Sequence, residues 1–398
     1  MKRGTKLLYK KIFAGLLGGG MLFMPNWSYA LPSGGQVVTN NGTITAGGKV
    51  MDITGSGNVA IDWNSFNIAA DEIVNFKNMQ AVLNYVSGGR KSEIFGKLNG
   101  AGVNVFLVNP NGILFGKTAQ VNVGQLTAST RSLEKAALNS FNGSLSPLDA
   151  GGAANVKADI INLGKLKAGK LVLEGNNLSI IGADSLEVAD KSKITLRAGE
   201  NINIGYEVTD KTTIDVGDGK GNTHQVSDYG KGGGDKASDV LSAASVTDLK
   251  GSAKSINDAM LVHDVYELQA IDRNTGTING SSYVVGNYML AGDIDAGDTK
   301  NWNSGRGFDP IGRLNRTGNG VTGSFSGAFD GICHSIQNLY IRQIGNQYDG
   351  YIGLFEGIGK GGSVGNVNMA GGHIEGTSNF GSIAGLNWGT IYNIVNSA

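Results

Sequence analysis

The chain has 398 residues, of which 64 are glycine, 5 are proline and 1 is cysteine, and its 33 basic residues balance its 33 acidic ones. A single cysteine excludes a disulfide framework, and the lack of a basic cluster argues against nucleic-acid binding. Apolar residues make up 40% of the chain, which is too high a share for a disordered glycine-rich protein. We therefore expect the glycines to separate many short strands.

Residues 1–30 have the three parts of a secretory signal peptide. Five lysine and arginine residues precede an apolar run at 12–24, and Ser28-Tyr29-Ala30 follows with a small residue at each end. The apolar run is shorter than the ~20 residues that span a membrane, so a membrane anchor is the less favoured alternative. We predict cleavage after Ala30. Removal of five of the 33 basic residues leaves 28 basic against 33 acidic residues and no membrane span.

Short strand-like runs fill the chain from Leu31 to about Thr130, with apolar residues at alternate positions and Gly, Asn or Ser between the runs. This alternation, without a long helical period, predicts an all-β structure. The stretch NVFLVNPNGILFG, residues 104–116, places Asn-Pro-Asn-Gly between two apolar runs. Because proline fixes φ and because asparagine and glycine tolerate positive φ, we predict two buried strands, 105–108 and 113–115, joined by a tight turn.

Residues 156–206 offer further short strands at roughly ten-residue spacing, which suits a solenoid better than a sandwich but is compatible with both. We expect the glycine-rich segment 217–239 to form an exposed loop or linker. Residues 240–270 are expected to include a helical turn or two.

The C-terminal part contains a repeated pattern, [ST]-[IV]-x-N-[ILV], at residues 335–339, 363–367 and 390–394. The steps of 28 and 27 residues predict stacked units, each of which buries its apolar face against its neighbours. The recurring asparagine has two open interpretations. Its amide bonds to the same residue of the next unit, or it adopts a left-handed turn. Because the third unit stops at Ala398 without a cap, we expect a truncated solenoid.

The sequence offers few residues in patterns that carry chemistry. Gly112 to Thr118 resembles a phosphate-binding loop, but Asn111 occupies the leading position, where that motif needs glycine. The aspartates of AGDIDAGD, residues 291–298, lack the order of a calcium loop, and the four histidines lack metal-ligand spacing. We predict no catalytic residue, no cofactor and no metal site.

Several segments, in this order, resemble the secretion domain of filamentous-haemagglutinin-type exoproteins, in particular the high-molecular-weight adhesin branch. The resemblance spans Leu31 to Arg131 and rests on LPSGGQVVTNNGTI, VAIDWNSFNIA, EIVNFKN, IFGKLNG and NVFLVNPNGILFGKTAQVNVGQLTAST. Further on, GAFDG, YIGLFEG and SIAGLNWGTI are similar to the short glycine-rich repeats called GLUG.

The resemblance implies a right-handed parallel β-helix with an N-terminal cap, exported by two-partner secretion. It also implies that an outer-membrane β-barrel transporter recognises the N-terminal part in the periplasm while it is unfolded. The family's Asn-Pro-Asn-Gly-Ile signature falls on Asn109, Pro110, Asn111, Gly112 and Ile113. Some relatives carry a second motif, Asn-Pro-Asn-Leu, upstream; this chain lacks it and has NYVSGGRKSE in the comparable region.

We therefore expect five parts: a signal peptide (1–30), a secretion domain (31–150), a β-helix continuation (151–216), a glycine-rich linker and irregular segment (217–270), and a GLUG-like repeat solenoid (271–398). The leading hypothesis is a secreted bacterial surface exoprotein of the adhesin type, without enzymatic activity. Its expected partners are the transporter and a host-cell glycan or protein receptor. Two alternatives stay open: a β-helical polysaccharide-degrading enzyme, although we see no ladder of paired carboxylates, and the delivery stalk of a contact-dependent toxin lacking its effector end.

Overall fold

The structure is a computed structural model that describes residues 31–146, 150–317, 320–344, 350–377 and 379–397. The predicted signal peptide and its cleavage after Ala30 lie outside the described residues. None of the helices in these ranges is both long and apolar enough to cross a membrane.

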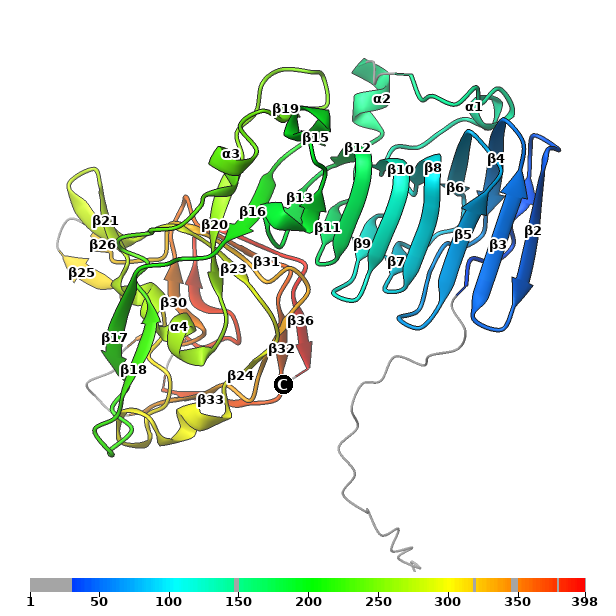
Figure 1. Ribbon diagram of the computed structural model, residues 1–398. Helices are drawn as coiled ribbons and strands as arrows, with labels where there is room; N and C mark the ends of the chain where they lie inside the picture. The colour runs from blue at the N-terminus through cyan, green and yellow to red at the C-terminus, as the bar shows by residue number, and fades with distance from the viewer. Residues whose placement is uncertain (1–30, 147–149, 318–319, 345–349, 378, 398) are drawn as a thin grey trace, which may run out of the picture.

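The chain forms two limbs of stacked β-strands joined by a connecting segment (Figure 1). We call residues 31–206 the N-terminal limb, residues 207–286 the connecting segment and residues 287–397 the repeat limb. The elements of the N-terminal limb are β1 (Gln36–Val37), β2 (Gly42–Gly47), β3 (Val50–Gly55), β4 (Asn58–Trp63), β5 (Ile73–Lys77), β6 (Ala81–Val86), β7 (Ser92–Ile94), β8 (Lys97–Val108), β9 (Ile113–Phe115), β10 (Gln120–Ser129), α1 (Lys135–Asn139), α2 (Ala150–Ala154), β11 (Ile160–Asn162), β12 (Lys165–Gly175), β13 (Leu178–Ile180), η1 (Ala183–Ser185), β14 (Leu186–Glu187), η2 (Lys191–Lys193), β15 (Ile194–Ala198) and β16 (Ile202–Tyr206).

The remaining elements are shorter. Those of the connecting segment are β17 (Lys211–Asp215), β18 (Thr223–Ser227), α3 (Ala237–Val240), β19 (Ser245–Thr247), β20 (Asn257–Val262), α4 (Val265–Ala270), η3 (Ile271–Arg273), β21 (Thr275–Ile278) and β22 (Ser281–Val284). Those of the repeat limb are β23 (Asn287–Leu290), β24 (Ile294–Asp295), η4 (Gly297–Asn301), η5 (Asn303–Gly305), β25 (Asn315–Thr317), β26 (Gly320–Thr322), β27 (Ala328–Asp330), β28 (Ser335–Gln337), β29 (Tyr340–Gln343), β30 (Phe355–Ile358), β31 (Ser363–Gly365), β32 (Asn368–Ala370), β33 (His373–Gly376), β34 (Ala384–Asn387), β35 (Thr390–Tyr392) and β36 (Val395–Ser397).

The N-terminal limb is a parallel β-helix with three faces. Long strands turn a corner and serve two faces: β8 pairs with β5 through its first residues and with β6 through its last ones. The third face is formed by β7, β9, β11, β13 and β16. Glycine occupies the corner because the rungs approach closely there. A Cβ on Gly124 of β10 would lie 2.7 Å from the carbonyl carbon of Gly102.

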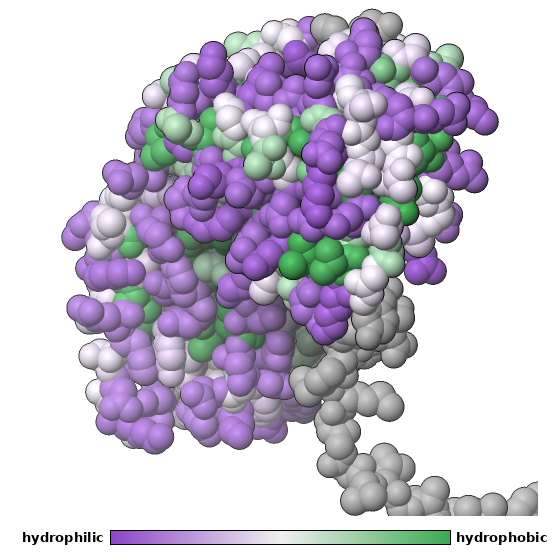
Figure 2. All heavy atoms as spheres, turned by 45° about the vertical axis from the view of Figure 1, so that its right-hand side comes forward, coloured by the Kyte–Doolittle hydropathy of each residue, from purple (hydrophilic) through white to green (hydrophobic). Residues whose placement is uncertain are grey.

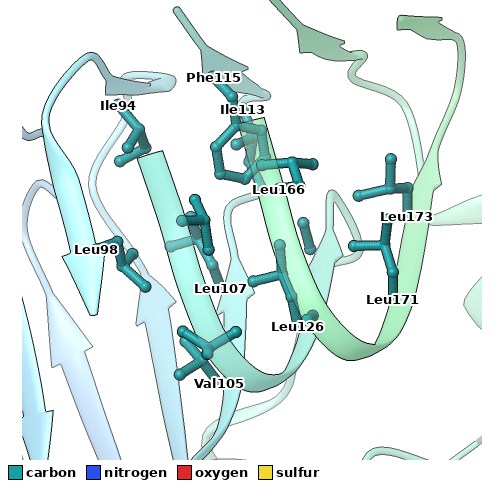
Figure 3. Close-up of a cluster of buried hydrophobic side chains, with 14 of the residues drawn as sticks. Ile94, Leu98, Val105, Leu107, Ile113, Phe115, Leu126, Leu166, Leu171 and Leu173 are labelled. Carbon is teal, nitrogen blue, oxygen red and sulfur yellow. The ribbon is translucent and has the colours of Figure 1, made fainter. Parts of the chain in front are cut away.

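Aliphatic side chains stack from rung to rung inside this limb. Val82, Val105, Leu126, Leu171 and Ile194 occupy equivalent positions on successive strands, and each is at most 1% exposed. Figure 3 shows three of them, Val105, Leu126 and Leu171, among the buried side chains between the strands. Burial of one such side chain contributes roughly 1.5–3 kcal/mol. The stack is therefore the main source of stability for the limb.

The N-terminal end of the β-helix is covered by a cap. Strand β1 runs antiparallel to β4, and β2 and β3 form an antiparallel hairpin, whereas the other pairs of the long sheet are parallel. Gly35, just before β1, packs closely against Trp63 of β4: a Cβ on Gly35 would lie 2.4 Å from the Trp63 ring. On the outside of the strands, Leu138 of α1 and Phe141, which follows this helix, pack against buried residues of β4, β6 and β8. The predicted all-β solenoid with a cap is confirmed.

One ten-stranded sheet continues from the N-terminal limb into the repeat limb, in the order β7-β9-β11-β13-β16-β20-β23-β27-β31-β35. This sheet curls until its outer surface meets itself. Ser179 of β13 and Asn203 of β16 both donate hydrogen bonds to the carboxylate of Asp330 in β27, at 2.6 and 3.2 Å. In Figure 1 β31, β32 and β36 accordingly lie on the side of the repeat limb that faces the N-terminal limb.

The register of the repeats differs from the expected one. The predicted 27-residue step is right, because Ser363–Gly365 pairs with Thr390–Tyr392. The 28-residue step is wrong, because Ser363–Gly365 pairs on its other side with Ala328–Asp330, while Ser335–Gln337 pairs with Asn368–Ala370. The sequence pattern therefore marks strands of two different sheets. Both strands end in an asparagine corner, which explains why they look alike in sequence.

The left-handed turn holds for all three repeated asparagines, whereas the amide ladder holds for two of them. Asn338, Asn366 and Asn393 all have positive φ, between 49° and 59°. Asn393 donates to Asn366 at 3.1 Å, so these two form the expected ladder. Asn338 instead donates to Asp295 at 3.1 Å. The corner is therefore a left-handed turn throughout and an amide ladder only where the rungs are in register.

The connecting segment is more ordered than its composition indicates. The loop expected at 217–239 is wrong for Thr223–Ser227, which form β18 and pair antiparallel with Lys211–Asp215. Their alternating apolar residues, Ile214 and Val226, are buried in a core that the connecting segment shares with the repeat limb. The predicted helical turn within 240–270 is confirmed by α4, which begins after the N-cap Asp264.

Candidate functional site

The turn at residues 109–113 lies between the second and third faces of the β-helix. As predicted, β8 ends at Val108 and β9 begins at Ile113, and both of these residues are buried. The two strands belong to different sheets, so the turn is a corner of a rung and not a hairpin. Gly112 has φ 110°, a conformation that favours glycine.

Asn109 holds this corner together from inside. Its side chain is fully buried and donates to the carbonyl of Arg90 and to Oγ of Ser92, both at 3.0 Å. Its Oδ1 accepts hydrogen bonds from the backbone N–H of Asn111 at 2.9 Å and from the amide of Asn111 at 3.2 Å. Each polar atom of the Asn109 side chain is therefore used within the folded rung.

The other residues of the turn are held by neighbouring rungs. Asn111 is exposed, but its amide donates to the carbonyl of Gly88 at 2.7 Å. The N–H of Ile113 donates to the carbonyl of Asp159 in the next rung at 3.1 Å. A Cβ on Gly112 would lie 3.2 Å from the same carbonyl oxygen. The structure thus brings all five predicted residues into one corner, with Asn109 inside and Asn111 outside.

A buried ion pair follows this corner in the next rungs. The N–H of Asn109 donates to the carbonyl of Ser129, whose Oγ donates to Glu174 at 2.6 Å. Arg131 binds both carboxylate oxygens of Glu174, at 2.7 and 2.8 Å, and both residues are at least 90% buried. Sequence reasoning missed this pair because its members are 43 positions apart and neither lies in a motif. Glu174 within the apolar run KLVLEG is the one local signal.

A cleft of about 730 Å³ separates the corner from the repeat limb. Asn111, Gly112 and Lys157 lie on one side, and Asn368 and Asn393 lie on the other. The two limbs are in direct contact at Asp330, which is 3% exposed and accepts hydrogen bonds from Ser179, Asn203 and the amide of Asn366. The limbs therefore touch beside the corner without covering Asn111.

The connecting segment contains a second buried polar cluster, around Glu267. Burial alone would raise the pKa of Glu267, but hydrogen bonds from His263 and Ser227 outweigh it and lower that pKa to about 2. The same bond to Glu267 raises the pKa of His263 above its usual range. The Oγ of Ser227 donates to the carboxylate and not to the histidine, so the three residues do not form a nucleophile activated by a base. This cluster holds the β17–β18 hairpin against α4.

Two further observations concern chemistry and surface. Among the residues that the structure describes, no group of three or more His, Cys, Asp or Glu is placed to bind a metal ion. Figure 2 shows that the face turned forward there is mostly hydrophilic and carries only small, separate hydrophobic patches. Such a surface suits contact with water along the outside of a solenoid.

Comparison with known families settles the membership of the chain. The model of the TPS secretion domain matches residues 28–295, which include the cap, the corner and the connecting segment. The chain belongs to this family. It is an exoprotein of the two-partner secretion type, and it is secreted or displayed at the cell surface. The resemblance to the secretion domain is thereby confirmed, and the match extends beyond Arg131.

Curated relatives match this TPS chain over different lengths. Halomucin of Haloquadratum walsbyi is 27% identical over 279 residues, which are 70% of this chain and 3% of halomucin. A heme/hemopexin-binding protein of Haemophilus influenzae is 33% identical over 177 residues, which are 43% of this chain and 19% of that protein. The chain thus spans less than a fifth of the length of either relative.

Two solved structures are also similar. The HMW1 secretion domain of Haemophilus influenzae is 16% identical, with a TM-score of 0.29 and coverage of 91% of this chain and 76% of that one. The filamentous hemagglutinin secretion domain is 14% identical, with a TM-score of 0.28 and coverage of 92% and 99%. The description of this fold therefore rests on its own strand pairing.

Proposed function

We propose that the corner Asn109–Ile113 is the part of the chain that an outer-membrane transporter recognises, and that recognition precedes folding. The observation that carries this proposal is the burial of Asn109. Its side chain is 0% exposed and its amide is consumed by four hydrogen bonds in the folded rung. A partner that reads this asparagine must therefore meet it before the rung forms. Pro110 and Gly112 then set the shape of the turn.

The test is secretion of the chain co-expressed with candidate outer-membrane transporters. Asn109→Ala is expected to abolish secretion. The matched control is Asn162→Ala, because Asn162 is also fully buried at the end of a short strand of the same limb and donates to Oγ of Ser185 at 3.0 Å. Each change leaves buried partners unpaired, at a cost of about 1–3 kcal/mol. Equal secretion of the two variants would show that stability, and not recognition, limits export, and secretion without any transporter would overturn the proposal.

The same proposal extends to the rest of the chain. After cleavage at Ala30, the mature protein acts at the cell surface as an adhesin-type exoprotein, with a host-cell glycan or protein as receptor and without catalytic activity. We divide it into a secretion domain (31–150), a β-helix continuation (151–216), a linker and irregular segment (217–270) and GLUG-like repeats (271–398). The match to the TPS secretion domain supports the exoprotein role. Adhesion of cells displaying the protein, compared with cells lacking it, tests this extension.

A further inference from the structure

A second cavity lies on the repeat limb, on the outside of the solenoid. It has a volume of about 470 Å³ and is bounded by the turn of η4 and by the edges of β29 and β33. Cavities of this size accept small molecules, roughly 300–1,000 Å³ being the usual range. The cavity does not involve the corner at 109–113, and export does not explain it.

The cavity is lined by an aromatic pair. Tyr340 and His373 are partners on adjacent rungs, and their rings stack with centroids 5.2 Å apart and planes 23° apart. His373 is exposed and Tyr340 is only partly buried. The main core of this limb holds neither ring, so the pair is not needed to fill the interior. Stacking covers the facing sides of the two rings, so a ligand in the cavity would pack against the remaining sides of these rings.

Polar groups lie around this pair. Asp298 and Lys300, both exposed, make no hydrogen bond or ion pair within the described part of the chain. Asn338 is fixed in a left-handed turn and donates to Asp295, so its Oδ1 is left as an acceptor. The cavity thus holds one unused carboxylate, one unused ammonium group and one amide oxygen.

The far wall of the cavity is bare backbone. Gly372 has φ 105°, and a Cβ at this position would lie 2.5 Å from the carbonyl oxygen of Leu339. A side chain is therefore excluded where β29 and β33 begin. This keeps the space beside the Tyr340 ring open and gives the cavity a fixed shape, since the wall cannot be filled by a rotating side chain.

We propose that this cavity binds a neutral saccharide unit. A sugar has an apolar C–H face that covers an aromatic ring, and hydroxyl groups that donate to Asp298 and accept from Lys300. An anion such as phosphate is disfavoured by the carboxylates of Asp295 and Asp298. A quaternary ammonium ligand, which aromatic rings also attract, is disfavoured by Lys300. Only a ligand that both donates and accepts, and carries no net charge, satisfies every group.

The experiment uses the purified chain without its predicted signal peptide. Saturation-transfer NMR is recorded with the methyl glycosides of glucose, galactose, mannose and N-acetylglucosamine, and with inorganic phosphate and choline as separate arms. At least one glycoside is expected to receive signal at its C–H protons. Tyr340→Ala should weaken its binding about tenfold or more, and Asp298→Asn by a similar factor. Tyr340→Phe, which keeps the ring, should stay within about threefold of wild type.

Tyr283→Ala is the matched control, because Tyr283 is a partly buried tyrosine in β22 that does not line the cavity. It should bind as wild type does. Thermal unfolding of each variant shows whether the fold is kept. The proposal is overturned if no glycoside binds, if Tyr340→Ala binds as well as Tyr340→Phe, or if phosphate or choline binds in a Tyr340-dependent way. These outcomes leave the secretion proposal untouched, since the assay contains no transporter.

Discussion

The two limbs form the same kind of solenoid but differ in strand length and in the side chains that fill the interior. In the N-terminal limb, strands such as β8 and β10 are 12 and 10 residues long, and the interior is filled by aliphatic stacks. In the repeat limb the strands from β27 onward have only three or four residues, and the interior holds Phe325, Phe329 and Phe355 in contact with one another. The N-terminal limb also has three-residue strands on its third face, β7, β9, β11 and β13. In the repeat limb all strands from β27 onward are short, and larger side chains fill the space.

The corners differ in the same sense. The N-terminal limb closes its corner with buried polar groups that are fully paired, above all Arg131 and Glu174. The repeat limb closes its corners with left-handed asparagines, of which Asn366 is buried and bonds to Asp330, whereas Asn393 is exposed. The clearest contrast is between two ion pairs: that of Arg131 and Glu174 is buried, whereas that of Arg342 and Glu375 lies at the surface. Substitutions of polar residues should therefore act unequally in the two limbs.

The largest difference is expected between two arginine variants. Arg131→Ala removes the two shortest charged contacts of Glu174, which is 1% exposed, and leaves the carboxylate with Oγ of Ser129 at 2.6 Å and the more distant Arg197 at 3.5 Å, so it should lower the free energy of unfolding by about 3 kcal/mol. Arg342→Ala removes an ion pair with Glu375 whose side chains are both more than 40% exposed, and should change nothing measurable. Urea unfolding followed by circular dichroism measures both. Similar losses in the two variants would break the contrast between inside and outside.

A smaller effect is expected where the limbs meet. Asp330→Ala leaves its donors Ser179, Asn203 and Asn366 without their acceptor and should cost about 1–3 kcal/mol. Asp330→Ala should also speed alkylation of Cys333. The N–H of Ile332 donates to Asp330, and loss of this bond loosens the turn that contains Cys333.

The control for this contact is Asp184→Ala in the N-terminal limb. Asp184 pairs with Lys165 at the surface and is 82% exposed. Neither stability nor the rate of Cys333 alkylation should change in this variant. An alkylation rate that stays constant in Asp330→Ala as well would show that the limbs hold together without the carboxylate.

The third prediction concerns pH and the connecting segment. The pKa of His263 is raised by its bond to Glu267, so its contribution to stability is complete below about pH 6.5 and is lost as pH rises through the raised pKa. The pKa of Glu267 is lowered to about 2, so its contribution is present above about pH 4.5 and is lost as pH falls through 2. This cluster should therefore stabilise most between about pH 4.5 and 6.5.

Denaturant midpoints measured from pH 3 to 9 check this window. His263→Gln should remove the decline on the alkaline side and reduce, without abolishing, the decline on the acid side, because His263 also lowers the pKa of Glu267 while Ser227 still donates to it. His224→Gln is the control, because His224 stacks on Tyr266 and does not contact Glu267. An unchanged alkaline decline in His263→Gln would assign the effect to other groups.

The smallest effects are expected at the exposed ends of the two asparagine ladders. Asn201 donates to Asn177 at 3.2 Å in the N-terminal limb, and Asn393 donates to Asn366 at 3.1 Å in the repeat limb. Both donors are exposed, so alanine at either position should lower the free energy of unfolding by no more than about 0.5 kcal/mol. A difference above about 1 kcal/mol between the two variants would show that surface ladders, too, distinguish the limbs.

The sequence predicted those parts of the structure that depend on residues close together in the chain. Strand alternation and the Pro-Asn-Gly turn correctly predicted β8, β9 and the corner between them, because turn residues act over four positions. The ordered family-like segments predicted the capped β-helix. For the candidate site, the five residues of the corner were named in advance, but the burial of Asn109 was not foreseen.

What could not be predicted depends on contacts far apart in the chain. Ser179 and Asp330 are 151 positions apart, and their bond follows from the curl of a ten-stranded sheet, for which no local pattern exists. The register of the repeats failed for a related reason. The corners after β28 and β31 need the same left-handed asparagine, so Asn338 and Asn366 share a local pattern although their strands lie in different sheets.

The curl of the ten-stranded sheet also sets how far this protein reaches. Ten strands spaced about 4.8 Å apart would measure about 43 Å end to end in a straight rod. Because β27 returns to touch β13, the first and last strands are closer than that, and the molecule is hooked. The described residues thus hold rungs of the repeat limb beside those of the N-terminal limb, so the length of this part of the protein does not grow in proportion to the number of its rungs.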